Sequence, residues 1–458
     1  MSFDFRVPAY GSVMYRATAR WLVQVLLWSL SALSLFAHAT DAPLTLSQAQ
    51  RLAVERSRQL AAQDSSITAA REMAVAAGQL PDPVLRLGID NLPINGADRF
   101  SVGRDFMTMR RIGVMQEFTR DDKRRLRAAR FDREGDRALA EKNAALAVIQ
   151  RDTATAWLDT FYLARLRAAV AEQAQETRLE IEAAEGAYRG GRGSQADVLT
   201  AHSSRVMLED RLSELDRRIR SARVVLARWI GQDAADAPLA GEPALDTVPL
   251  QVHSLEEQLQ QRHPNFAVMT QEVAITQTEV ALARANKRSD WTGEIMYQKR
   301  GPDFSDMVGI GVSIPLQWDQ KRRQDRELGA KLALAEKAQA QRDEALRQHV
   351  AEVRTMLNEW ENGRERLVRY QRELVPLARN RTQAVVSAYR GGKGDLTAVV
   401  TARRNEIEVL AQSLQLEIDT ARAWAQLRFL YPDEAVSSAA HSTTNGQRGV
   451  TVDVRKGQ

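Results

Sequence analysis

The chain has 458 residues, of which 27% are charged and 6% aromatic, and its formal net charge is +5. Acidic and basic residues are interspersed, which is typical of solvated helix faces and argues against a nucleic-acid-binding surface. The chain contains no cysteine, so disulfides and cysteine metal ligands are excluded. Abundant Ala, Arg, Glu and Leu favour long helices, so we expect a mostly α-helical protein with a small β portion.

The amino terminus, residues 1–39, is predicted to be a signal peptide. Arg16 and Arg20 precede an apolar run from Trp21 to Phe36, and Ala37 and Ala39 form an A-x-A cleavage pattern. After it, no apolar segment is long enough to span a bilayer as a helix. An exported protein of this kind would therefore cross a membrane only as strands.

The first structural repeat is predicted over residues 40–245. Its expected elements are, in chain order, a helix at 47–78, strands at 84–91 and 111–118, a very long helix at 121–188, a turn with its tip at 189–197, and a return helix at 195–229. Apolar residues recur at three- and four-residue spacing in the long helix, as a packed helical seam requires. These residues are Leu158, Phe161, Tyr162, Leu166 and Val170.

The second repeat is predicted over residues 246–432, with the same order of elements. They are a helix at 254–285, strands at 291–299 and 308–318, a long helix at 319–389, a turn with its tip at 390–398, and a return helix at 396–429. Pro376 is expected to kink the long helix. The tail, 433–458, is rich in Ser, Thr, Gly and charge, and we expect it to be disordered.

Two sequence blocks occur twice in the same order. AYRGGRG at 187–193 returns as AYRGGKG at 388–394, and the GV…DDKRR block at 113–125 returns as GV…DQKRR at 311–323. Chance similarity between alanine-rich helices does not readily produce both blocks in one order. The chain is therefore predicted to be a duplicated unit, each copy carrying a long antiparallel coiled-coil hairpin with a glycine turn at its tip.

The four strands alternate between one apolar and one polar face. In 308–318, Val308, Ile310 and Val312 share the apolar face, and the other three strands follow the same pattern. This alternation is typical of a transmembrane barrel with a wet lumen, although each strand alone would also suit a half-buried soluble sheet. Four strands cannot close a barrel, so we expect copies to assemble in a ring. Three copies would supply about twelve strands.

The ordered set of motifs resembles the outer membrane efflux protein family, the TolC-like channels of tripartite pumps and type I secretion. The resemblance covers about 44–432 and rests on LTLSQAQRLA from Leu44, LPDP from Leu80, both strand-to-helix joints and both AYRGGxG tips. It implies a homotrimer with a β-barrel in the outer membrane of a Gram-negative cell and an α-helical tunnel through the periplasm.

The same resemblance implies partners and a cargo. The partners are a periplasmic adaptor protein, an inner-membrane transporter of the RND type and outer membrane lipid. The block from Phe106 looks like members associated with heavy-metal and cation export, so metal cations or drugs are the expected solutes. Three alternatives stay open, namely a type I protein-secretion duct, a periplasmic coiled-coil adaptor and a soluble coiled-coil scaffold.

Candidate site residues lie at the two hairpin tips. By resemblance, Asp197 and Tyr389 match a pair that holds the closed tip, although Tyr389 could equally be a packing residue. The tips are basic and could contact carboxylates or carbonyls of the adaptor, or could be merely solvated turns. The candidates for that contact are Arg189, Gly190, Gly191, Arg192, Gly193, Arg390, Gly391, Gly392, Lys393 and Gly394.

No catalytic, cofactor or metal site is predicted. The histidines after the signal, including His202, His263 and His349, lack the short paired spacing of metal ligands and are expected on helix surfaces. Met107, Met109 and Met115 are interpreted as space-filling residues rather than soft-metal ligands. No nucleophile elbow, P-loop or dinucleotide fingerprint occurs, so we expect a protein that is not an enzyme.

Overall fold

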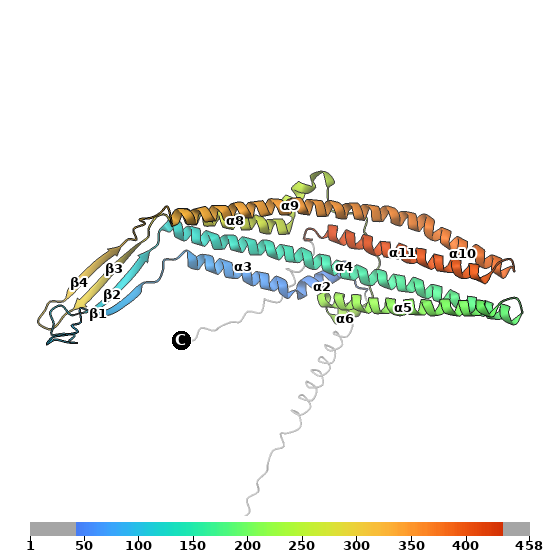
Figure 1. The fold of residues 1–458 in the computed structure, drawn as a ribbon, viewed down its shortest axis with the longest axis horizontal. Coiled ribbons are helices and arrows are strands. Elements are labelled where there is room, and N and C mark those ends of the chain that lie inside the picture. Colours follow the sequence, from blue (N-terminus) through green and yellow to red (C-terminus); the bar gives the residue numbers. More distant parts are fainter. Residues whose placement is uncertain (1–42, 434–458) are drawn as a thin grey trace, which may run out of the picture.

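The computed structural model describes residues 43–433. The protein is a long, gently bent rod, with a small sheet at one end and two helical hairpin tips at the other (Figure 1). The predicted signal peptide and, apart from Asp433, the predicted tail lie outside the described residues. Between residues 43 and 433, no helix is both long and apolar enough to cross a membrane.

The elements follow the predicted order. The main helices are α2 (Leu46–Arg56), α3 (Arg58–Ala77), α4 (Asp121–Arg189), α5 (Gln195–Ile230), α7 (Leu255–Arg262), α8 (Pro264–Ala285), α9 (Gln324–Arg369), α10 (Val375–Arg390) and α11 (Leu396–Arg428). Shorter elements are α6 (Gln232–Asp236), the 3₁₀ turn η1 (Val252–Ser254) and the π-helical turn η2 (Tyr370–Leu374). The strands are β1 (Val84–Asp90), β2 (Met109–Phe118), β3 (Trp291–Lys299) and β4 (Met307–Ser313).

Each short helical arm is broken once, where one continuous helix was expected. Ser57 ends α2 and caps α3, because its Oγ accepts a hydrogen bond from the Leu60 N–H at 3.3 Å. In the second repeat, Pro264 starts α8, and the preceding His263 is extended with φ −76° and ψ 123°. A residue before proline disfavours the helical region, so α7 must end there.

The second hairpin contains the predicted irregularity near Pro376, in another form. A π-helical turn, η2, lies directly before Val375 and places Pro376 in the first turn of α10. Proline removes a backbone donor and clashes with the preceding turn of a regular α-helix, and a π-helical turn relieves both problems. The helix from α9 to α10 therefore runs on through a local change of hydrogen-bonding pattern.

The main core surrounds the middle of α4. Trp157 is fully buried there, its ring stacks on Phe161 at 5.3 Å, and its Nε1–H donates to the Leu44 carbonyl at 3.1 Å. The predicted seam is confirmed, since Leu158, Tyr162, Leu166 and Val170 are all buried in this cluster and Phe161 packs against it. The backbone of Leu44, before α2, pairs with that of Leu239, after α6. Both side chains pack in or against this core.

The four strands form one antiparallel sheet in the order β1-β2-β3-β4. The register aligns one row from Leu87 through Ile112 and Tyr297 to Val308, and all four side chains are exposed. The opposite face carries charged and small residues, including the Arg86–Glu294 ion pair at 3.7 Å. The predicted alternation is confirmed, although β4 ends at Ser313 rather than at residue 318.

Candidate functional site

Both hairpin tips have the same backbone geometry. In the first, the Arg192 N–H donates to the Ala187 carbonyl at 2.9 Å and the Gly191 N–H to the Tyr188 carbonyl at 3.0 Å. These two bonds, with a left-handed Gly191 at φ +69°, define a Schellman motif. The second tip repeats both bonds around Gly392, at φ +72°. The AYRGG phrase is repeated because each residue in it has a fixed place in this helix end.

The return helices start differently at the two tips. Ser194 caps α5, and its backbone N–H and hydroxyl both donate to the Asp197 carboxylate, at 2.8 and 2.7 Å. This capping box lowers the pKa of Asp197, because the Ser194 hydrogen bonds favour the charged carboxylate. At the second tip, Asp395 occupies the cap position without a side-chain cap bond.

The two equivalent tip tyrosines have different surroundings. Tyr188 is 50% exposed, whereas Tyr389 packs against an apolar cluster that joins both hairpins. Its buried members are Ile181, Ala184, Ala201, Leu396, Val399 and Val400. Tyr389 is therefore part of the contact between the hairpins, and Tyr188 presents its side chain to the outside.

The predicted gate residues are neighbours across this contact. Burial first and the negative charge of Asp197 second raise the pKa of Tyr389. Val198, next to Asp197, lies in the same apolar cluster as Tyr389. Among the described residues, however, no hydrogen bond joins Asp197 to Tyr389, because the carboxylate is held by Ser194.

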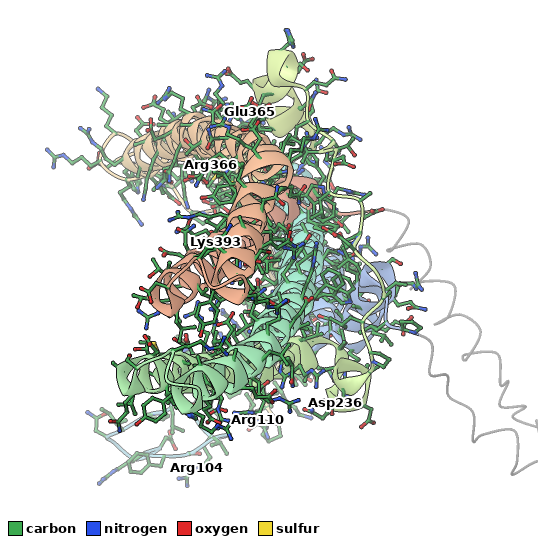
Figure 2. All side chains as sticks on the ribbon, turned by 90° about the vertical axis from the view of Figure 1, so that its right-hand side faces the viewer. Arg104, Arg110, Asp236, Glu365, Arg366 and Lys393 are labelled. Carbon is green, nitrogen blue, oxygen red and sulfur yellow. The ribbon has the colours of Figure 1, made fainter. Side chains whose placement is uncertain are left out.

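The outermost side chains of both tips are basic and exposed. They are Arg189, Arg192, Arg390 and Lys393. Figure 2, viewed from the tip end, shows Lys393 at the end of the second hairpin with the helices receding behind it. These four positive charges lie at the tip end of the rod, and Arg189 also forms an ion pair with Glu185 at 3.6 Å.

A charged cluster behind the tips connects the two hairpins, and sequence reasoning missed it. Arg403 of α11 contacts three carboxylates, those of Glu176 and Glu180 on α4 and of Glu406 on its own helix. Its Nε donates to Glu180 at 3.0 Å, and its Nη1 lies 3.4 Å from Glu406. We call this group of four residues the Arg403 clasp. Only 15% of the Arg403 side chain is exposed.

The clasp lines one wall of a cleft of about 610 Å³ between α4 and the second hairpin, together with Arg379 and Tyr389. Burial raises the pKa of Glu180, and the positive charge of Arg403 opposes that rise. The spacing of Glu176 and Glu180 places both on one helix face, which was the available sequence signal. Their partner lies more than 200 residues away, so spacing alone could not identify it.

Two histidines come together, which corrects the prediction that each lies separately on a helix surface. The Nε2 atoms of His263 and His349 are 3.0 Å apart, and the Nδ1 of His349 is 3.2 Å from Glu352. Burial first and His349 second lower the pKa of His263 to about 4. The pairing escaped notice because 86 residues separate the two rings.

The remaining candidate ligands do not converge. Met109 and Met115 are six residues apart on β2, which places them roughly 20 Å apart along the strand. Within residues 43–433, no group of three or more His, Asp or Glu side chains is arranged to hold a metal ion. Among the described residues, the hairpin tips and the Arg403 clasp are therefore the candidate functional site.

Comparison with protein families gives a match over residues 255–431 to the outer membrane efflux protein family. The matched segment includes β3, β4, the second hairpin and Arg403. The match lies in the second half of the described chain. Comparison with curated protein sequences gives no match.

Solved structures of three outer membrane proteins have the same fold. The outer-membrane channel OprN aligns with a TM-score of 0.72 at 18% identity, over 85% of this chain and 90% of that chain. The CmeC outer membrane channel of Campylobacter jejuni gives 0.71 at 12% identity, over 90% of each chain. The outer membrane protein VceC of Vibrio cholerae gives 0.65 at 19% identity, over 83% of this chain and 96% of that chain.

OprN and CmeC, which share this fold, are outer membrane channels. The helical rod and the amphipathic sheet are the two parts that such a channel requires. The predicted mostly helical fold, with four strands per chain, is confirmed.

Proposed function

We propose that this chain is an outer membrane efflux protein, that it forms the exit duct of a tripartite pump and that it acts as a homotrimer. The observation that carries the proposal is the sheet, because its apolar face is exposed and its two edge strands each lack a neighbour within the described chain. Lipid suits the apolar face but cannot satisfy unpaired backbone groups. Three copies would close a barrel of about twelve strands, and each repeat, 40–245 and 246–432, would supply two strands and one hairpin.

The hairpins would form the wall of a periplasmic tunnel that ends at the tips. The basic residues Arg189, Arg192, Arg390 and Lys393 are suited to carboxylates or carbonyls of a periplasmic adaptor, and the glycines between them keep the turns narrow. The adaptor would connect the duct to an inner-membrane transporter, of the RND type by family resemblance. A water-filled duct is passive, so that transporter would supply the energy and select the cargo, metal cations or drugs.

The closed state would be held by contacts between the two hairpins. The Arg403 clasp is one of these, and charge-assisted hydrogen bonds in a partly buried site are stronger than those at the surface. Tyr389 would add apolar contact, and Asp197 would exchange its bond to Ser194 for one to Tyr389 as the tips tighten. Separation of α11 from α4 would then break the clasp and widen the tip.

Mass measurement and conductance test the proposal together. The full chain, extracted from outer membranes in detergent, should have three times the protomer mass and should form ion-conducting channels in a planar bilayer. A stable monomer in buffer without detergent would contradict it. Contact with the adaptor can be mapped by single cysteines at Lys393 or Arg192, because the chain has no native cysteine to interfere.

A further inference from the structure

The duplication relates the strands residue by residue. Asp82, before β1, corresponds to Asp290, before β3, at a spacing of 208 residues. Gly113 of β2 corresponds to Gly311 of β4 at a spacing of 198 residues. Each strand of the first repeat thus has a defined counterpart in the second.

The observed hydrogen-bonding register obeys these spacings. Val84 of β1 pairs with Met115 of β2, and their counterparts, Thr292 and Ser313, pair with each other in β3 and β4. The β1–β2 and β3–β4 hairpins therefore have the same register. The same correspondence can be applied to the β2–β3 contact, which joins the two repeats.

The β2–β3 contact continues into an ion pair at its helical end. The Lys123 ammonium lies 2.8 Å from the Asp290 carboxylate and is 95% buried, with 5% of the side chain exposed. The Arg120 N–H donates to the other oxygen of Asp290 at 2.8 Å, and Phe118 stacks on Trp291 at 4.1 Å. These contacts fix the start of α4 against the strand of the other repeat.

The residues equivalent to this ion pair do not meet within one chain. Lys321 corresponds to Lys123 and Asp82 to Asp290, yet both are exposed, and neither has an ion pair among residues 43–433. β2 runs to Phe118, whereas β4 stops at Ser313, three residues before the position equivalent to Phe118. Residues 319–323 form turns, although the equivalent residues open α4. The second repeat lacks the neighbour that the first repeat has.

We propose that β1 of a second copy pairs antiparallel with β4 in the register dictated by β2–β3, and that Asp82 of that copy pairs with Lys321. Applying the two spacings to the observed pairs Val114–Ile295 and Ile112–Tyr297 gives Val312 opposite Leu87 and Ile310 opposite Ile89. The inference rests on the trimer proposed above and specifies how its copies join.

The chemistry of both edges fits this register. The four paired residues, Leu87, Ile89, Ile310 and Val312, all lie on the exposed apolar face, so pairing continues the apolar rows from one copy to the next. A shift of one residue would oppose apolar to polar positions along the whole edge. Bringing Asp82 to Lys321 also gives both charges the partner that they lack in a single chain.

Disulfide trapping of the full chain in outer membranes tests the register. Leu87→Cys with Val312→Cys should give covalently linked dimers and trimers on oxidation, because directly opposed residues have Cα atoms about 4.5 to 5.5 Å apart. β1 and β4 are the two edges of one sheet, about 14 Å apart, so a disulfide within one copy is excluded. The matched control is Leu85→Cys with Ile310→Cys, two residues on the same face but displaced by four positions, which should stay unlinked.

The outcomes separate this inference from the proposed function. Linkage of the control pair, or of neither pair in a protein whose mass is still trimeric, would overturn the register and leave the duct proposal intact. A monomeric mass for the unmodified chain would overturn both. Charge reversal gives an independent check, since Lys321→Asp and Asp82→Lys should each reduce the trimer fraction and the double variant should restore it. Failure of the double variant to restore the trimer, with each single variant folded, would refute the ion pair.

Discussion

Removal of the Arg403 charge is the sharpest test of the gate. Arg403→Gln removes the cation that Glu176, Glu180 and Glu406 share, and Glu406 keeps only the weaker contact with Arg379 at 3.8 Å. The Glu180 and Glu406 side chains are only 11% and 6% exposed. Removing one partner of a fully buried ion pair costs about 3 to 5 kcal/mol. The clasp borders a cleft, and burial raises the pKa of Glu180 despite Arg403, so its net contribution is smaller. We therefore expect the substitution to destabilise the closed state by about 2 kcal/mol, which raises the ratio of open to closed channels about 30-fold.

Single-channel recording in a planar bilayer measures this effect directly. The fraction of time spent in the conducting state should rise about 30-fold for Arg403→Gln at constant voltage and salt. The control is Arg404→Gln, because Arg404 is the next residue, is exposed, and forms no ion pair with another described residue; its Nη2 donates to the Met207 sulfur at 3.3 Å. If both variants open equally often, the clasp does not hold the closed state. A double-mutant cycle with Glu180→Gln would then show whether the pair contributes to any state.

Three further predictions concern stability. Trp157→Ala should lower the free energy of unfolding by about 3 to 5 kcal/mol, because a fully buried indole leaves a cavity; denaturant titration in detergent would measure it. The pKa of His263 falls from 6.5 to about 4 on folding, so its contribution to stability is complete above pH 6.5 and is lost as the pH falls toward 4. That loss is about 3 kcal/mol, and His263→Gln should flatten this part of the pH dependence of the denaturation midpoint. Gly392→Ala should cost about 1 kcal/mol at its positive φ, whereas Gly186→Ala, inside α4, should stabilise by a similar amount; thermal denaturation would show opposite shifts.

The helices and strands were predictable because their signals are local. The glycine phrase fixes both helix ends through φ values that only glycine adopts readily, and alternation fixes the two faces of each strand. The breaks at Ser57 and His263 were missed, because helix periodicity continues across them. The helices break there because Ser57 forms a cap hydrogen bond and because the residue before Pro264 is restricted to an extended conformation.

The candidate site was predictable only in part. The two tips follow from the repeat, whereas the gate pair of Asp197 and Tyr389 stays a prediction, and the Asp197 carboxylate is bonded to Ser194. The Arg403 clasp and the pairing of His263 with His349 depend on which helices become neighbours. No spacing rule within one helix contains that information, so such contacts require the fold.

The π-helical turn at 370–374 gives the two hairpins different mechanics. The first hairpin rises on α4, a single helix of 69 residues, and the second on α9 and α10, which meet at that turn beside Pro376. The change of hydrogen-bonding pattern and the neighbouring proline favour bending at this point. In a ring of three copies, a stiff first hairpin and a more flexible second hairpin would alternate around the axis. Opening at the tips would then occur by bending of the second hairpin of each copy at residues 370–374, while the first hairpins stay straight.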